Sequence, residues 1–296
     1  MFEQVVVGID GQAGGRDALA LARELVEPKA SVVLANVYLG DIVPGREPGA
    51  FNADQRAHAH EVLEAARREA GIEARIMPVG SRQVGRGLHE LADEITADLI
   101  VVGSSRRGLW RRVWQGDDMR AALNGAPCAV AIAPTGYAER PHALTEIGVG
   151  YDGLPESRFA LEVARTLAAQ HGARISVFEA VSIEAGYVDA RHPDQPALEE
   201  HVRQAYERLG KLEGVEPHAA YGDAAEELAL FGASVDLLIV GSRGFGPLGR
   251  LIHGSTSTRL AKTARCPLMV LPRAARTRGQ AVGEEAEQPV TASAST

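Results

Sequence analysis

The feature that most constrains this chain is an internal duplication. The segment Asp98-Leu-Ile-Val-Val-Gly-Ser104 returns 138 residues later as Asp236-Leu-Leu-Ile-Val-Gly-Ser242, and the same displacement carries Cys128 onto Cys266. Chance repetition of apolar runs would not hold its register over so long a stretch. The pattern indicates one domain copied in tandem, and a length of 296 residues leaves room for two domains of ordinary size.

The start of each half supports the same division. An apolar run ending at Asp10 is echoed by one ending at Asp152, 142 residues further on. The sequence predicts two tandem domains and a tail, over residues 1–140, 143–275 and 276–296. The junction at 134–141 contains two prolines and a glycine, which predicts a short surface connection. The tail has no periodic apolar face, which predicts disorder.

Short apolar runs alternate with amphipathic stretches in both halves. Strands are predicted over residues 4–9, 31–37, 73–79, 99–103 and 129–133, then 146–151, 174–181, 217–221, 237–241 and 268–271. Helices are predicted over 16–26, 53–70, 84–97 and 117–124, then 156–171, 197–212, 224–233 and 255–264. Strands that are apolar at nearly every position indicate a parallel sheet covered on both faces. We therefore expect two tandem α/β domains, each a doubly wound five-stranded parallel sheet. Ligands of such domains bind at the carboxyl ends of the strands, where the strand order reverses.

The composition excludes several functional classes. Asp and Glu number 39 against 31 Lys and Arg, a net charge of −8, which argues against a broad surface for nucleic acid. Two cysteines are too few for a disulfide framework, and no Cys/His cluster suggests a metal site. The longest apolar runs are too short to span a bilayer, and no signal peptide is visible. The expected protein is cytoplasmic and binds neither nucleic acid nor membranes.

The loop after the fourth strand of the second half is the richest candidate site. Its glycines let the backbone approach an anion without obstruction by Cβ atoms. It leads into a hydroxyl-rich helix start, where free N–H groups and a partial positive charge favour phosphate. The residues concerned are Gly241, Gly244, Gly246, Gly254, Ser255, Thr256 and Ser257. A flexible loop before an ordinary capped helix is the plainer alternative.

Two better-known phosphate motifs do not fit this loop. The run at 244–249 reads G-x-G-x-x-G, but it follows the fourth strand rather than the first, and no acidic ribose ligand follows it. The loop also lacks the lysine of a P-loop, which excludes a motor-type NTPase.

The spacing Gly241-x2-Gly244-x9-Gly254-Ser255 resembles the signature of ATP-binding universal stress proteins. Two repeats of this kind cover nearly all of residues 1–273, so the chain is similar to a tandem universal stress protein. The resemblance implies the Rossmann-like fold of the adenine nucleotide alpha-hydrolases and bound ATP, with the presence of Mg²⁺ left open. It also implies that Gly241, Gly244, Gly254, Ser255 and Thr256 hold the ribose and the phosphates.

The same resemblance places an aspartate at the adenosine end of the ligand and a valine against the base. These are Asp152 and Val181 in the second half, and Asp10 and Val37 in the first. Read from the residues alone, a carboxylate that ends an apolar strand has two roles open to it. It caps the turn that starts the next helix, or it accepts hydrogen bonds from a ligand.

The first half departs from the signature. It keeps Gly103, Gly108 and Gly116, but Arg106 stands where the second glycine should be and Asp117 replaces the hydroxyl. Two like charges 4 Å apart cost about 4 kcal/mol at an effective dielectric constant of 20. The amino end of a helix stabilises a bound anion by only roughly 0.3–2 kcal/mol. The sequence therefore predicts that the second site binds ATP more tightly than the first.

No catalytic arrangement of side chains can be argued from the sequence, and Cys128 and Cys266 fit buried apolar packing better than redox chemistry. The leading hypothesis is a stress-response module whose bound nucleotide changes its surface for unknown protein partners. A slow ATPase or nucleotide-transforming enzyme is one alternative, and an interaction scaffold with decayed sites is another. In the family that the chain resembles, the last strand often pairs domains. Strands 129–133 and 268–271 therefore join the two halves as a pseudo-dimer or meet another chain in a homodimer, and the sequence leaves this choice open.

Overall fold

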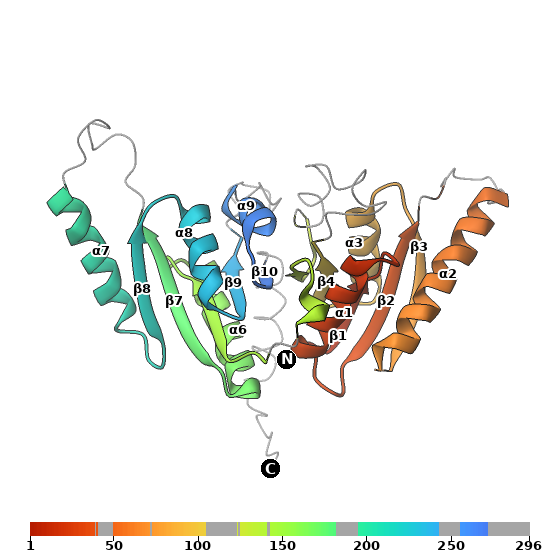
Figure 1. Cartoon of the computed structure of the whole chain (residues 1–296), viewed down its shortest axis with the longest axis horizontal. Helices are drawn as coiled ribbons and strands as arrows, with labels where there is room; N and C mark the ends of the chain where they lie inside the picture. The colour runs from red at the N-terminus through yellow and green to blue at the C-terminus, as the bar shows by residue number, and fades with distance from the viewer. Residues whose placement is uncertain are drawn as a thin grey trace, which may run out of the picture.

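The computed structural model describes residues 1–38, 40, 50–71, 73–104, 123, 125–140, 143–181, 195–242 and 255–271. Within them, ten strands form one continuous sheet in the order β3-β2-β1-β4-β5-β10-β9-β6-β7-β8. Figure 1 shows the two halves side by side, with α2 and α7 at the outer ends of the sheet. None of the described helices combines the length and the apolarity that crossing a bilayer requires.

The elements follow the predicted alternation closely. The first half contains β1 (Gln4–Gly8), α1 (Ala13–Leu25), β2 (Ser31–Tyr38), α2 (Ala50–Ala70), β3 (Ala74–Gly80), α3 (Val84–Glu94), β4 (Leu99–Gly103) and β5 (Ala129–Ala133). The second half contains β6 (Glu146–Gly150), α6 (Pro155–His171), β7 (Arg174–Val181), α7 (Gln195–Leu209), β8 (Glu216–Tyr221), α8 (Ala224–Phe231), β9 (Leu237–Gly241), α9 (Ser255–Thr263) and β10 (Leu268–Leu271). Two short 3-10 turns, η1 (Tyr137–Glu139) and η2 (Gly232–Ser234), complete the described elements. The helix predicted over 117–124 lies outside the described residues apart from Leu123, and so does the predicted tail.

Each half is doubly wound, as predicted. The first strand lies between the second and the fourth, β1 between β2 and β4 and β6 between β7 and β9, and all four of these pairings are parallel. The strand order therefore reverses between β1 and β4 and between β6 and β9, and folds of this kind bind ligands at the carboxyl ends of such pairs.

The two halves join through their last strands within one chain. β5 and β10 run antiparallel, with Met269 opposite Ala131. The other strand pairs of the sheet are parallel. The pairing that the sequence left open is thus made inside the chain, and it converts two five-stranded sheets into one sheet of ten strands.

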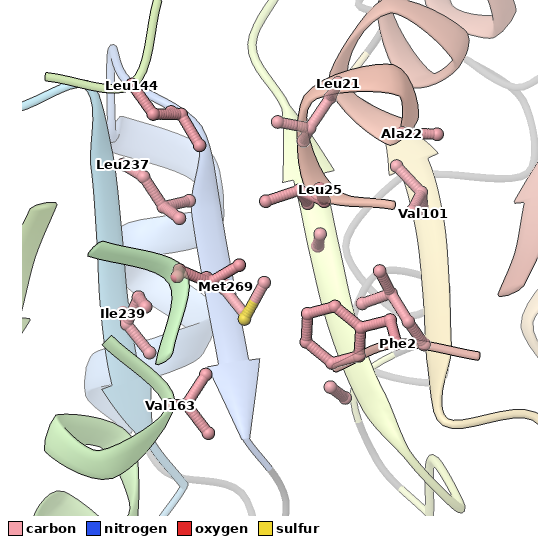
Figure 2. Packing of buried hydrophobic residues seen from close by; sticks show 14 of the residues in the cluster. Phe2, Leu21, Ala22, Leu25, Val101, Leu144, Val163, Leu237, Ile239 and Met269 are labelled. Atoms are coloured by element: carbon pink, nitrogen blue, oxygen red, sulfur yellow. The ribbon is translucent and has the colours of Figure 1, made fainter. Parts of the chain in front are cut away.

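Apolar side chains form a core on each face of this sheet, and both cores include residues of both halves. Helices α1, α2, α6 and α7 cover one face, whereas α3, α8 and α9 cover the other. Figure 2 shows the first core where the halves meet, with Met269 of β10 facing Phe2 and Leu25 of the first half. Cys128 and Cys266 are buried in the second core, which confirms their predicted packing role.

The aspartate that opens the repeated segment ties two strands together in each half. Asp98 precedes β4, and its carboxylate accepts the Glu3 N–H at 2.7 Å, at the start of β1. Asp236 precedes β9 and accepts the N–H groups of Thr145 and Glu146 at 2.8 and 2.9 Å. Burial raises the pKa of Asp98, and the hydrogen bonds from the backbone oppose that rise. The repeated aspartate is therefore explained by the fold rather than by a ligand.

The described part of the connection between the halves lies mostly at the surface, as expected, but one of its residues is buried. Tyr137 is buried in the first core, and burial raises the pKa of its phenol to about 12. The carboxylate of Asp17 in α1, itself only 2% exposed, accepts the N–H groups of Gly136 and Ala138, both at 2.9 Å. Prolines and glycine do mark a turn here, but a buried carboxylate fixes that turn against α1.

Replacing Asp17 by alanine should therefore loosen the connection. Two partly buried N–H groups lose a charged acceptor, and we expect the free energy of unfolding to fall by about 1–3 kcal/mol. Asp17→Asn keeps one acceptor oxygen and should cost less. Urea unfolding measures the loss, and amide hydrogen exchange at residues 136 and 138 locates it. Glu139→Gln, on the exposed side of the same turn, is the control. Unchanged exchange at 136 and 138 would show that Asp17 does not hold the turn.

Candidate functional site

The structure describes only part of the predicted site. Gly244, Gly246 and Gly254, and Gly108, Gly116, Arg106 and Asp117 of the first half, lie outside the described residues, as does the side chain of Ser255. The described members are Asp152, Val181, Gly241, Thr256 and Ser257, with Asp10, Val37 and Gly103 in the first half. They follow or end the central strands, or begin α9.

Asp10 holds the turn that starts α1. Its Oδ1 atom accepts the N–H groups of Gln12 and Gly15, at 2.9 and 2.8 Å. Between Asp10 and Gln12 the chain turns through Gly11 at a φ of +73°, a conformation that glycine adopts without strain. Of the two roles that the sequence left open for this carboxylate, the structure shows the turn-capping one, which engages the Oδ1 atom.

Asp152 occupies the corresponding turn in the second half. Its Oδ1 atom accepts the Leu154 N–H at 3.0 Å, and Gly153 repeats the positive φ at +75°. Ser157 stands in the place of Gly15, and its hydroxyl accepts the Asp152 N–H at 3.3 Å and donates to the carbonyl of Leu154. A carboxylate has a second oxygen atom and several lone pairs, so this turn is compatible with a ligand contact.

Gly103 and Gly241 end the fourth strand of each half. Because they have no side chain, the backbone of a neighbouring helix can approach the strand end closely. A Cβ at Gly103 would lie 2.1 Å from the carbonyl oxygen of Gly14 in α1. A Cβ at Gly241 would lie 2.8 Å from the carbonyl carbon of Glu156 in α6. These glycines are required because a helix backbone crosses close to each strand end.

Ser242 comes directly after Gly241 and was not among the residues predicted from the loop spacing. The available signal was its place as the last residue of the repeated segment. The residue is 7% exposed, and its hydroxyl finds no hydrogen-bond partner among the described residues. Gly150 of β6 pairs with Val240 of β9, and Asp152 and Ser242 each follow this pair by two residues. A buried hydroxyl and a carboxylate thus lie at adjoining strand ends, where a polar ligand group would satisfy the hydroxyl.

Val37 and Val181 do not occupy equivalent positions. Gly8 pairs with Ala35, two residues before Val37, whereas the corresponding Gly150 pairs with Phe178, three residues before Val181. Since side chains alternate along a strand, the two valines point to opposite faces of the sheet. Val37 lies in the second core with α3. A contact with a base through the side chain therefore cannot take the same form in both halves.

The described part of α9 supplies hydroxyl groups near its first turn. Ser257 is buried and Thr256 is half-buried. Because α9 runs from the end of β9 back to the start of β10, its amino end lies at the carboxyl edge of the sheet. This is the edge that carries Asp152 and Ser242.

A cleft of about 840 Å³ opens at the other edge, among the amino ends of β2 and β3. Its charged lining residues are Arg23, Glu27, Lys29, Glu73 and Arg75. Glu27 already accepts a hydrogen bond from Gln170 at 2.7 Å and pairs with the amino terminus. The cleft therefore has mixed charge and is not the predicted site.

Comparison with known proteins identifies the family. Residues 1–134 and 144–272 each match the universal stress protein family. The chain belongs to the universal stress protein family. It carries two copies of the family's domain in tandem, one in each half of the sheet.

Individual relatives agree with this assignment. A universal stress protein of Mycobacterium tuberculosis is 30% identical over 73% of this chain and 78% of its own length. One from Thermus aquaticus is 32% identical over 42% of this chain and 95% of its own length, as expected for a single-domain relative. The crystal structure of a universal stress protein from Archaeoglobus fulgidus covers 91% of this chain and 98% of its own, with a TM-score of 0.64 at 20% identity, which shows a shared fold.

Proposed function

We propose that this universal stress protein binds ATP at the switch point of its second domain and acts as a nucleotide-dependent module in the stress response. The observation that carries the proposal is that Asp152 and Ser242 follow neighbouring strand ends, and that the buried Ser242 hydroxyl has no hydrogen-bond partner among the residues that the structure describes. Helix α9 begins at the same edge of the sheet, and the sequence that leads to it carries the glycine spacing that begins at Gly241. The proposal requires a cytoplasmic location, where ATP is present.

The residues fit the parts of such a ligand. The carboxylate of Asp152 would accept hydrogen bonds from the hydroxyl groups of the ribose. The Ser242 hydroxyl and the N–H groups at the start of α9 would donate to phosphate oxygens. Val181 ends β7, the strand that pairs with β6, and is the candidate contact for the base. Gly241 contributes indirectly, because it lets α6 approach the strand end and so sets the position of Asp152.

The first domain should bind the same ligand more weakly or not at all. Gly103, Gly108 and Gly116 preserve part of the glycine spacing. Asp117, however, stands at the position of the serine whose hydroxyl would bind phosphate in the second half. Like-charge repulsion there exceeds the attraction of a helix terminus. The expected stoichiometry is one tightly bound ATP per chain.

Titration of ATP by calorimetry tests the proposal. Asp152→Asn keeps the oxygen atom that accepts the Leu154 N–H and removes the negative charge. We expect the affinity for ATP to fall about tenfold to a hundredfold, since a hydrogen bond to a charged group is lost.

Asp10→Asn is the matched control, because it makes the same change in the first domain and should leave the tight site unaltered. Equal affinities in Asp152→Asn and the wild type would contradict the assignment of Asp152. A protein that carries no nucleotide when purified and ignores added ATP would overturn the proposed function.

Two assays distinguish the proposed binding module from the alternatives, a slow ATPase and a scaffold with decayed nucleotide sites. A time course of ADP release, with Gly254→Glu to block the phosphate loop, distinguishes a binding module from a slow ATPase. Nucleotide released from heat-denatured protein distinguishes both from a scaffold with decayed sites.

A further inference from the structure

One arginine links helix α9 of the second domain to the start of helix α8. Arg259 lies in the second turn of α9, and its guanidinium donates to Asp223 at 2.7 Å and to Glu226 at 3.0 Å. Both carboxylates belong to the start of α8, where Asp223 is the N-cap residue. The side chains of Arg259 and Asp223 are each about half exposed.

Asp223 uses its two oxygen atoms for different purposes. Oδ1 accepts the N–H groups of Ala225 and Glu226, at 3.0 and 3.1 Å, and so caps α8. Oδ2 receives Arg259. The arginine also holds the pKa of the Asp223 carboxyl below its usual value. The first turn of α8 is thereby fastened to the second turn of α9 by charged hydrogen bonds.

Neither partner of this contact exists in the first domain. At the displacement that relates the repeats, Ala121 stands in the place of Arg259. The N-cap residue of α3, the counterpart of α8, is Gln83, whose side chain makes no capping hydrogen bond. The arginine link therefore occurs in the domain that keeps the phosphate signature, and its residues are missing where the signature is degraded.

We propose that Arg259 is a positioning residue of the nucleotide site, which fixes the amino end of α9 for the phosphate groups by anchoring it to Asp223 and Glu226. This inference rests on the proposed function and deepens it. The link lies at the carboxyl edge of the sheet, because α8 follows β8 and α9 follows β9 at that edge. The Arg259 link fixes the helix that would bind the phosphates. It makes no hydrogen bond with Asp152, where the adenosine part of the ligand would bind.

Calorimetric titration of the full chain with ATP and, separately, with adenosine tests the proposal. Arg259→Ala and Asp223→Asn should each weaken ATP binding about twofold to fivefold, the range for partly exposed ion pairs, and leave adenosine binding unchanged. Asp223→Asn keeps the oxygen atom that caps α8, so the helix should remain intact. Arg259→Lys should restore part of the affinity. The double variant should be no worse than Arg259→Ala alone, because that change already removes the contact with Asp223.

Asp223→Asn also separates positioning from simple charge neutralisation. If Arg259 only offset the nearby carboxylates, removing one of them would tighten ATP binding, and that result would overturn the proposal. Unchanged ATP affinity in the variants, or an equal loss for adenosine, would overturn it as well. A wild-type protein that binds neither ligand would overturn the proposed function and this inference together.

Discussion

Gly103→Ala should lower the free energy of unfolding by at least about 3 kcal/mol, because the new Cβ would meet backbone that cannot move aside. The atom would lie 2.1 Å from the carbonyl oxygen and 2.7 Å from the carbonyl carbon of Gly14. Overpacking that side chains and backbone absorb by small shifts typically costs about 1–3 kcal/mol, and occasionally more. Here helix α1 would have to leave β4, and Asp10 and Asp17 would lose their places with it.

Chemical denaturation of Gly103→Ala and the wild type measures this effect. Gly210→Ala is the control, since its Cβ would lie 3.4 Å from the carbonyl oxygen of Tyr206, an ordinary contact, and should change stability by less than about 0.5 kcal/mol. Similar unfolding free energies for Gly103→Ala and Gly210→Ala would show that α1 is not packed against the strand end as described. The same geometry applies to Gly241, so lost ATP binding in a Gly241 variant would not identify a ligand contact.

Met269→Ala should destabilise both domains together. Met269 is fully buried on β10 and faces Phe2 and Leu25 of the first domain (Figure 2). Removing most of a buried side chain of this size costs about 2–5 kcal/mol, depending on how far the cavity closes. Because each core contains residues of both domains, we expect a single unfolding transition that moves to lower temperature as a whole.

Calorimetry and circular dichroism on the same samples test this prediction. Leu230→Ala, at a leucine that is 70% exposed, provides the control and should leave the transition almost in place. Two separate transitions in the wild type, or one that shifts while the other stays, would show that the domains unfold independently.

The periodicity of the chain was sufficient to predict most of the fold. The runs at 99–103 and 237–241 became β4 and β9 with the predicted bounds, because a strand buried on both faces must be apolar at each position. The ends of helices were predicted less accurately than the strands. The helix predicted over 84–97 ends at Glu94, because capping and packing decide the last turn. The duplication and the glycine spacing that starts at Gly241 were likewise sufficient to indicate the family.

The sequence by itself determined the duplicated α/β architecture, because local apolar periodicity and repeated segments are properties of neighbouring residues. Only the tertiary structure decided how distant residues meet. It placed Asp17 under the linker, joined β5 to β10 within the chain, and gave Gly103 and Gly241 a role in helix packing. It also set Val37 and Val181 on opposite faces of the sheet. Such contacts depend on strand register and helix approach, which arise when separate segments pack, so no local pattern encodes them.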